Sequence, residues 1–187
     1  MECSWRRHGH SPISMALLFF TIALILWSCS LAKAGGDLIN DVCSESRNPP
    51  SCIKALHSDP RSASADLKGL AKISINLSTK SAKSTWKLVD ALKKNATNKS
   101  LKEIYDSCLE NYDEAIYDLD DCTRLLGSGD FQGVNLRASA AMAYAGTCDD
   151  NFREAQITEP PQLVDASNNL QDLSSILLVI SHLLEGN

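Results

Sequence analysis

The sequence contains few of the residues from which an enzyme active site or a nucleic-acid surface is built. Only four of its 187 residues are histidines. The two beyond the N-terminal segment, His57 and His182, stand far apart in no metal-site or catalytic-triad spacing. No glycine-rich phosphate loop occurs, and no convincing strand pattern is found. The net charge of −5 argues against nucleic acid or an anionic membrane as a partner. We therefore expect no catalytic residue, no metal and no cofactor.

Long apolar runs are also scarce, and the one present lies near the N-terminus. Two arginines precede the apolar residues 16–27, a run shorter than the roughly 20 residues that a membrane-spanning helix needs. Residues 32–34 (AKA) have the small-x-small pattern that signal peptidase cleaves. We therefore expect residues 1–34 to be a cleaved signal peptide. The secreted chain would begin near Gly35, without a membrane anchor and with a net charge of about −7.

Five cysteines follow the predicted signal peptide, and a secreted protein normally pairs its cysteines. Cys43 and Cys52 flank two prolines that stop helices, so we expect them to close a short helical hairpin. The odd number leaves one thiol free. The same secretory route makes three Asn-x-Ser/Thr sequons candidates for glycosylation, at Asn76, Asn95 and Asn98.

Four stretches have apolar residues at helical spacing and predict long helices: 65–94, 100–126, 131–153 and 163–184. We expect Ser100 and Glu103 to form a capping box at the start of the second helix. The predicted fold is all-α: an up-and-down four-helix bundle in residues 63–187, preceded by a disulfide-clipped α-hairpin in residues 35–62. The second helix has the clearest period, with steps of four and three that join Leu101, Tyr105, Cys108, Tyr112, Ala115, Leu119, Cys122 and Leu126.

The third helix has a face almost without side chains, formed by Ala138, Ala141 and Ala145, and Cys148 lies beside it. Small residues let two helices approach closely enough for a disulfide. Because Cys108 lies on the apolar face of the second helix, we predict a Cys108–Cys148 disulfide. Cys122 is then the free thiol, and its place among apolar residues predicts a buried and unreactive side chain.

An acidic stretch on the second helix is the strongest candidate for a binding surface. Glu110, Glu114, Tyr117, Asp118 and Asp121 are spaced so as to share the face away from the apolar residues. Each carboxylate by itself fits an ordinary solvated helix face. As a group beside tyrosines, they fit a surface that binds a basic or hydrogen-bonding protein cleft. Acid–base catalysis is disfavoured because a convex helix face offers no pocket to separate the carboxyl pKa values.

Five stretches together resemble the plant invertase and pectin methylesterase inhibitor family. The resemblance implies secreted inhibitors, without enzymatic activity, that form one-to-one complexes with pectin methylesterase or with acid invertase. It also implies the disulfides Cys43–Cys52 and Cys108–Cys148, in agreement with the spacing. The stretches are CSESRNPPSC (43–52), ALHSDPRSASADLKGLA (55–71), CLENYDEAI (108–116), SGDFQGVNLRASAA (128–141) and AGTCDDNF (145–152).

The resemblance favours pectin methylesterase as the partner and acid invertase as the alternative. Invertase inhibitors typically have Pro-Lys-Phe after the Gly-Asp that follows the second helix, whereas residues 131–133 here are Phe-Gln-Gly. In the esterase branch the bundle of a free monomer would cover the enzyme's active-site cleft in the cell wall, without covalent chemistry. Small side chains of the third helix would then fit against the cleft rim. The contact residues implied by position are Glu110, Tyr112, Glu114, Thr147 and Asp150, with Tyr117 at a place that is often acidic and Asp118 as its substitute.

Two further classes of protein remain as alternatives. A hydrolase would need a pocket with a perturbed acid pair, for which no motif is found. A structural or carbohydrate-binding wall protein would bind pectin directly. We expect the negative net charge to repel de-esterified pectin.

Overall fold

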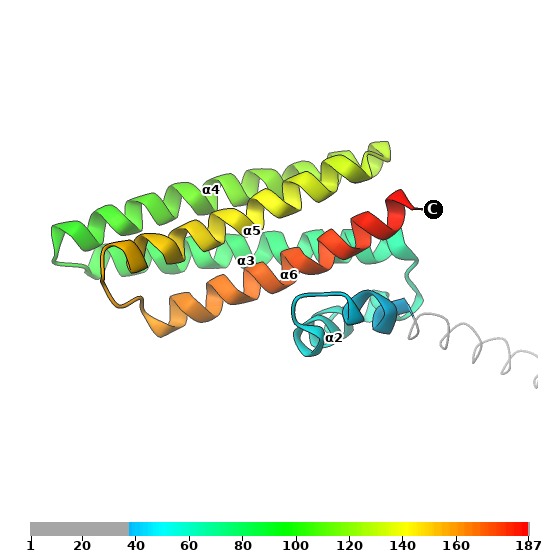
Figure 1. Cartoon of the computed structure of the whole chain (residues 1–187), viewed down its shortest axis with the longest axis horizontal. Coiled ribbons are helices and arrows are strands. Elements are labelled where there is room, and N and C mark those ends of the chain that lie inside the picture. Colours follow the sequence, from blue (N-terminus) through cyan, green and yellow to red (C-terminus); the bar gives the residue numbers. More distant parts are fainter. Residues whose placement is uncertain (1–37, 187) are drawn as a thin grey trace, which may run out of the picture.

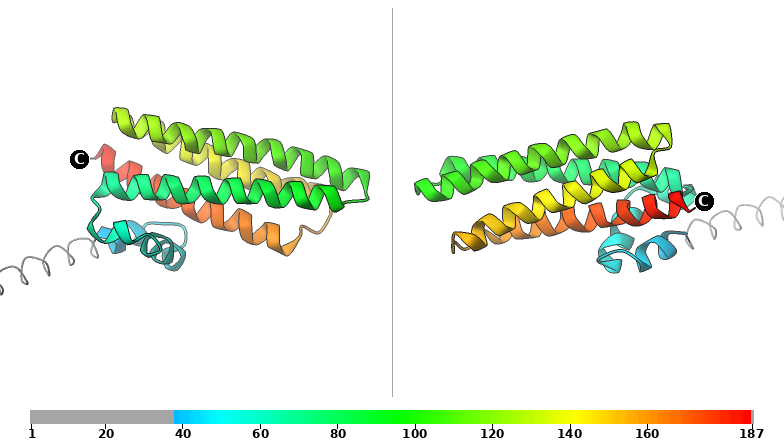
Figure 2. Two further views of the ribbon diagram at one scale, coloured as in Figure 1. Left: turned by 180° about the vertical axis from the view of Figure 1, so that it is seen from behind. Right: turned by 45° about the horizontal axis from the view of Figure 1, so that its top comes forward.

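The computed structural model describes residues 38–186, and within that range the chain is helical without strands. Four long helices run alternately in opposite directions and form a ring in which each packs against the next and the last closes on the first (Figures 1 and 2). The predicted all-α four-helix bundle is confirmed. The predicted signal peptide lies outside the described residues. The four helices are α3 (Leu67–Asn95), α4 (Lys99–Ser128), α5 (Phe131–Glu154) and α6 (Pro161–Glu185).

A helical hairpin precedes the bundle and packs against α6 (Figure 1). It comprises helical residues 38–44 and α2 (Pro49–His57), and the 3₁₀ turn η1 (Pro60–Ser64) follows. A disulfide joins Cys43 to Cys52, with 5.4 Å between their Cα atoms. The hairpin is fixed to α6 by polar contacts. The Arg47 backbone N–H donates to Ser175 Oγ at 2.7 Å, and Asn48 Nδ2 donates to Asp172 Oδ2 at 2.8 Å.

The start of α4 differs from the sequence expectation. Its N-cap is Asn98, whose Oδ1 accepts a hydrogen bond from the Leu101 N–H at 3.3 Å. The capping box predicted for Ser100 and Glu103 is wrong, because the helix begins at Lys99 and encloses Ser100 in its first turn. Asparagine is among the best N-cap residues, which accounts for the earlier start. Glu103 instead forms an exposed ion pair with Lys99 at 3.6 Å.

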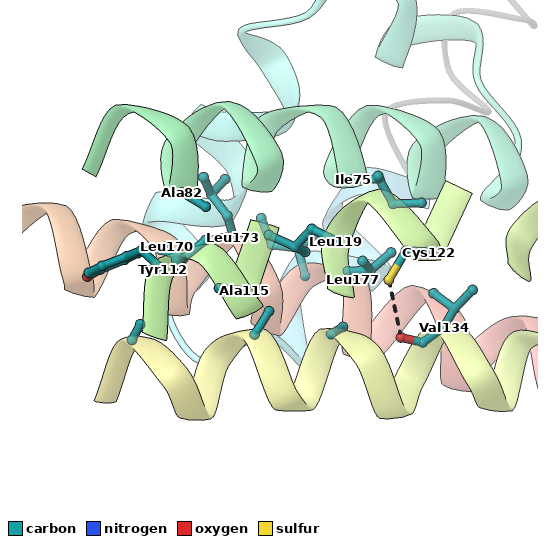
Figure 3. Packing of buried hydrophobic residues seen from close by; sticks show 14 of the residues in the cluster. Ile75, Ala82, Tyr112, Ala115, Leu119, Cys122, Val134, Leu170, Leu173 and Leu177 are labelled. Atoms are coloured by element: carbon teal, nitrogen blue, oxygen red, sulfur yellow. Dashed lines mark hydrogen bonds between the residues drawn. The ribbon is translucent and has the colours of Figure 1, made fainter. Parts of the chain in front are cut away.

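The core lies along the axis of the bundle and follows the period predicted for α4. Tyr112, Ala115, Leu119 and Cys122 point into the interior (Figure 3) and none has any exposed surface. Leucines of α6 meet them from another side of the ring. Burial of each such leucine contributes about 1.5–3 kcal/mol. The helices are therefore held in place by their apolar faces, and their outer faces are left for contacts with other molecules.

Candidate functional site

A disulfide joins the two helices that carry most of the predicted contact residues. Cys108 on α4 and Cys148 on α5 are both fully buried, with 4.8 Å between their Cα atoms. Ala141 and Ala145 precede Cys148 on the inner side of α5 and have no exposed surface. Such small side chains let the two backbones approach to disulfide distance. The crosslink therefore fixes how the outer side chains of α4 are placed relative to those of α5.

The outer surface above this crosslink, which we call the α4/α5 face, consists of Glu110, Glu114 and Tyr117 on α4 and Ala143, Thr147 and Asp150 on α5. Tyr117 is 64% exposed, and its ring lies 6.0 Å from the Arg137 guanidinium carbon. Thr147 is exposed, and its hydroxyl donates to the Ala143 carbonyl at 3.0 Å. Asp150 is half-exposed and forms an ion pair with Arg153.

The two glutamates of the α4/α5 face are chemically the most available groups on it. Glu110 and Glu114 are exposed, one helical turn apart. Within residues 38–186 neither carboxylate forms an ion pair or a side-chain hydrogen bond, although most acidic residues of α4 do. Free acceptor oxygens on a rigid surface are suited to hydrogen-bond donors of a partner protein.

Two residues expected on this surface are buried instead, which corrects their predicted role as contacts. Tyr112 is fully buried, and Asp118 is only 3% exposed. The Tyr112 hydroxyl is enclosed near Ser167 and Asp149 without a hydrogen bond of normal geometry. Asp118 Oδ1 accepts a 2.6 Å hydrogen bond from Arg137. Both expectations fail because positions 112 and 118 turn toward the interior with the apolar residues of α4.

The bare stripe of α5 faces inward, where its small side chains let α4 and α5 approach closely, so a partner's cleft rim would have to meet other small residues of this helix. Ala138, Ala141 and Ala145 have no exposed surface and pack in the bundle core. The exposed small residues of α5 are different ones, among them Ser139, Ala143 and Thr147. A smooth outer surface is therefore present, but it lies on the other side of the helix.

Sequence reasoning missed two residues beside the α4/α5 face. Leu136 is 69% exposed, although leucine is normally buried. It stands between the buried positions Val134 and Ala138, so its outward orientation can be read from the helical period. Arg137 was also missed. It reaches across to Asp118 and, at 3.3 Å, to Asp121, and no local motif indicates a contact between residues so far apart in the chain.

A second group of acidic side chains, Asp149 and Glu159, lies at the α5–α6 connection, where both residues are partly buried. Asp149 Oδ2 accepts hydrogen bonds from Ser167 Oγ at 2.9 Å and from Gln171 Nε2 at 3.1 Å. Burial raises the pKa of Asp149 despite these bonds. Burial and the negative charge of Asp149 raise the pKa of Glu159 to about 7. This acid pair is partly buried and lies away from the α4/α5 face, so it bears on stability more directly than on partner binding.

The free thiol has none of the features of a nucleophile. Cys122 is fully buried, and its thiol donates a weak 3.8 Å hydrogen bond to the Val134 carbonyl (Figure 3). Burial, with the charges of Asp118 and Asp121, raises its pKa to about 12. Reactive cysteines have lowered pKa values and access to solvent. Among residues 38–186 no three His, Cys, Asp or Glu side chains are placed to hold a metal ion.

The three sequons lie on exposed asparagines. Asn76 is in the middle of α3, Asn95 ends that helix with its amide on the Ala91 carbonyl, and Asn98 caps α4. Glycosylation of these residues stays a prediction. In the part of the chain that the structure describes, no helix has the length and apolarity needed to cross a bilayer.

Comparison with known proteins gives a consistent result. Residues 37–180 match the family model described as plant invertase/pectin methylesterase inhibitor. The chain is 48% identical to a pectinesterase inhibitor of Actinidia deliciosa over 95% of this chain and 98% of that protein. It is 27% identical to the Arabidopsis thaliana cell wall/vacuolar inhibitor of fructosidase 2, over 92% and 98% of the two chains. The crystal structure of a mutant pectin methylesterase inhibitor from Arabidopsis is similar, with a TM-score of 0.69 and 31% identity over 75% of this chain and 93% of that one.

Proposed function

The chain belongs to the plant invertase/pectin methylesterase inhibitor family, and we propose that it inhibits a pectin methylesterase by binding over its active-site cleft. The higher identity to a pectinesterase inhibitor than to a fructosidase inhibitor supports this choice. The relatives are named as inhibitors, so the chain acts on an enzyme without carrying out a reaction of its own.

One observation carries the mechanism: the α4/α5 face, with its two unpaired glutamates, is rigidly positioned by the Cys108–Cys148 disulfide. A preorganised surface loses little conformational entropy on binding. Glu110 and Glu114 would accept hydrogen bonds from the esterase, while the small exposed residues of α5 allow close approach of the cleft rim. The complex is non-covalent, since the one free thiol among residues 38–186, Cys122, is buried.

We further propose that the inhibitor acts outside the cell, as a monomer that binds one esterase molecule. The predicted signal peptide and the two disulfides support secretion into the cell wall. The α-hairpin of residues 35–62 would serve as a support for the bundle, residues 63–187, because its described part packs on α6 and away from the α4/α5 face.

The alternative target, acid invertase, is disfavoured at the α4–α5 turn. The Asp130 side chain accepts a hydrogen bond from the Gly133 N–H at 2.8 Å and caps α5. Phe131 and Gln132 are therefore part of the first turn of α5. The Pro-Lys-Phe that invertase inhibitors typically carry at residues 131–133 is missing, and this turn offers no replacement for it.

A matched pair of arginine substitutions tests the docking surface. Ala143→Arg places a long charged side chain on the α4/α5 face, and Ala91→Arg makes the same change on the exposed surface of α3. Each variant is titrated at about pH 6 against a plant pectin methylesterase and an acid invertase. We expect Ala143→Arg to weaken esterase inhibition at least tenfold and Ala91→Arg to leave it unchanged. Equal esterase inhibition by both variants would exclude the α4/α5 face as the docking surface. Inhibition of invertase alone would show that acid invertase, not pectin methylesterase, is the target.

A second pair tests the carboxylates themselves. Glu114→Gln should weaken esterase binding by about tenfold, because a charge-assisted hydrogen bond contributes about 1.5–3 kcal/mol. Glu103→Gln, at an exposed position near the start of the same helix, removes the same charge and should have little effect. If both variants lose affinity equally, the net charge of α4 matters and the α4/α5 face has no special role.

A further inference from the structure

The charges of this acidic protein are separated between helices. Helix α3 carries seven lysines and one aspartate, whereas α4 carries eight acidic and three basic residues. Helix α6 has three acidic residues and no lysine or arginine. Helix α3 is therefore strongly positive although the net charge of the protein is negative. It is the helix nearest the viewer in the left panel of Figure 2.

Three of these lysines line a groove between α3 and α4, which we call the lysine groove. Lys80, Lys83 and Lys87 are spaced by three and four residues, so they share one side of α3 over about 10 Å. The groove has a volume of about 510 Å³ and is completed by Asp120 and Thr123 of α4. Apart from Ile75 its lining side chains are polar, and none of them is aromatic, so the groove favours a charged ligand over a neutral sugar that stacks.

Most of the positive charge in the lysine groove is uncompensated. Lys83 pairs with Asp120 at 3.2 Å, and both side chains are about half exposed. Within residues 38–186 Lys80 and Lys87 are exposed and form no ion pair. Lys80 also borders a second groove of about 370 Å³, between α2, α3 and α6, which Lys54 lines as well. Positive charge thus continues around α3 from one groove into the other.

We propose that the lysine groove binds a linear polyanion whose charges are carboxylates: the de-esterified pectin that a pectin methylesterase produces. The positive charge of the groove is complementary to such a ligand, its three lysines are spread over about 10 Å along α3, and hydroxyl and amide groups that can hydrogen-bond to a sugar border it. The choice of this polymer over other polyanions rests on the proposed function, because ester hydrolysis by the target enzyme converts a neutral polymer into a carboxylate polymer. The inhibitor would then be retained where its target has been active.

The lysine groove lies on the α3 side of α4 and the α4/α5 face extends toward α5, so the two are neighbours on α4, with Asp120 of the groove one helical turn from Tyr117 of the face. Lys83 approaches α4 at Asp120 from the α3 side, whereas Tyr117 of the α4/α5 face contacts Arg137 from the α5 side. A polymer in the groove would therefore leave open the proposed esterase contacts on α5, which contributes no residue to the groove lining. The negative net charge led to the expectation that de-esterified pectin is repelled. On this proposal it is not, because the net charge is a sum over the whole protein, whereas the polymer would contact only the positive surface of α3.

The test measures retention of the mature protein on immobilised polygalacturonate, with highly methyl-esterified pectin and anionic phospholipid vesicles as comparisons. All proteins carry Asn76→Gln, because Asn76 lines the groove and a glycan there would fill it. The groove variant is Lys80→Gln with Lys83→Gln and Lys87→Gln. The control variant is Lys93→Gln with Lys94→Gln and Lys99→Gln, three lysines outside the groove that form ion pairs.

We expect the parent and the control variant to bind polygalacturonate in about 20 mM NaCl, and to be released in about 300 mM NaCl. The groove variant should bind about tenfold more weakly, as expected for the loss of three exposed ion pairs. Methyl-esterified pectin should retain none of them.

Three results would overturn the proposal: no retention of the parent on polygalacturonate, equal loss in the control variant, or equal retention of the parent on lipid vesicles. Esterase inhibition, measured separately as methanol release, should be the same for the parent and the groove variant. If the protein binds the polymer but inhibits no esterase, the proposed function is refuted, whereas the proposal that the lysine groove binds a polyanion stands. If the protein inhibits the esterase but is not retained on polygalacturonate, only the proposal for the lysine groove is refuted.

Discussion

Arg137 on α5 donates a 2.6 Å hydrogen bond to Asp118 on α4 and so pairs a carboxylate that is almost fully buried. The Arg137 side chain is 39% exposed, and its guanidinium also contacts Asp121. The bond joins the two helices that carry the α4/α5 face, near its end, while the Cys108–Cys148 disulfide joins them farther along. Asp118 therefore stabilises the packing of α4 against α5, and with it the α4/α5 face, and is not itself part of that face.

Asp118→Asn should lower the free energy of unfolding by about 2 kcal/mol, because it removes a hydrogen bond to a charged, buried group. Urea denaturation measures this loss. Asp120→Asn, at a half-exposed position with a surface ion pair, should change stability by no more than about 0.5 kcal/mol. If Asp118→Asn keeps full stability but loses esterase inhibition, Asp118 is a direct contact after all.

Tyr112→Phe should leave stability unchanged or slightly higher, and esterase inhibition intact. The enclosed hydroxyl has no hydrogen bond of normal geometry, so its removal eliminates a desolvated polar group while the packing ring stays. Thermal unfolding and an inhibition titration on the same preparation check both points. Reduced inhibition at unchanged stability would contradict the buried position of Tyr112.

Stability should fall as pH rises from about 5 to about 8. The pKa of Glu159 is raised from its ordinary 4.5 to about 7 by burial and by Asp149, whose own pKa is also raised. A raised pKa means that the folded state holds the proton more tightly. Its contribution is therefore complete below the ordinary value and is lost as pH passes through about 7. The pKa of Asp121 is lowered, so its contribution to stability is lost only as the solution becomes more acidic, and it does not affect the range from about pH 5 to about pH 8.

Glu159→Gln should flatten this pH dependence and stabilise the protein at about pH 8, because it removes the repulsion between two enclosed carboxylates. Glu154→Gln removes an equal charge from an exposed position at the end of α5 and should preserve the slope. Urea midpoints across the pH range measure both. A Glu159→Gln protein with the parent's slope would show that another group titrates.

Cys122 should resist thiol reagents in the folded mature protein at about pH 8 and react once per chain after unfolding. Its pKa of about 12 leaves little thiolate, and its side chain has no exposed surface. Cys122→Ala should keep both disulfides and full esterase inhibition. Rapid modification of the folded protein would mean that α4 and α5 separate locally near Val134.

The amino-acid sequence alone was sufficient for the four bundle helices and for the core face of α4. These features follow from local periodicity, because leucine and alanine at steps of three and four cannot all be buried unless the segment is helical. The branch of the family was also readable, from residues 131–133 and the stretches around Cys108 and Cys148. The N-cap of α4 was placed two residues late because two capping residues, Asn98 and Ser100, stand close together.

Only the tertiary structure decided which of the predicted contact residues face solvent, since Tyr112 and Asp118 are buried. Small residues occur on both sides of α5, and packing alone shows that Ser139, Ala143 and Thr147 are the ones exposed to a partner. Contacts such as Arg137 with Asp118, or Asp149 with Glu159, depend on how helices and loops pack and follow from no local pattern. The lysines of α3 form a groove for the same reason: net charge is a sum over the chain, whereas a binding surface depends on where the fold places each charge.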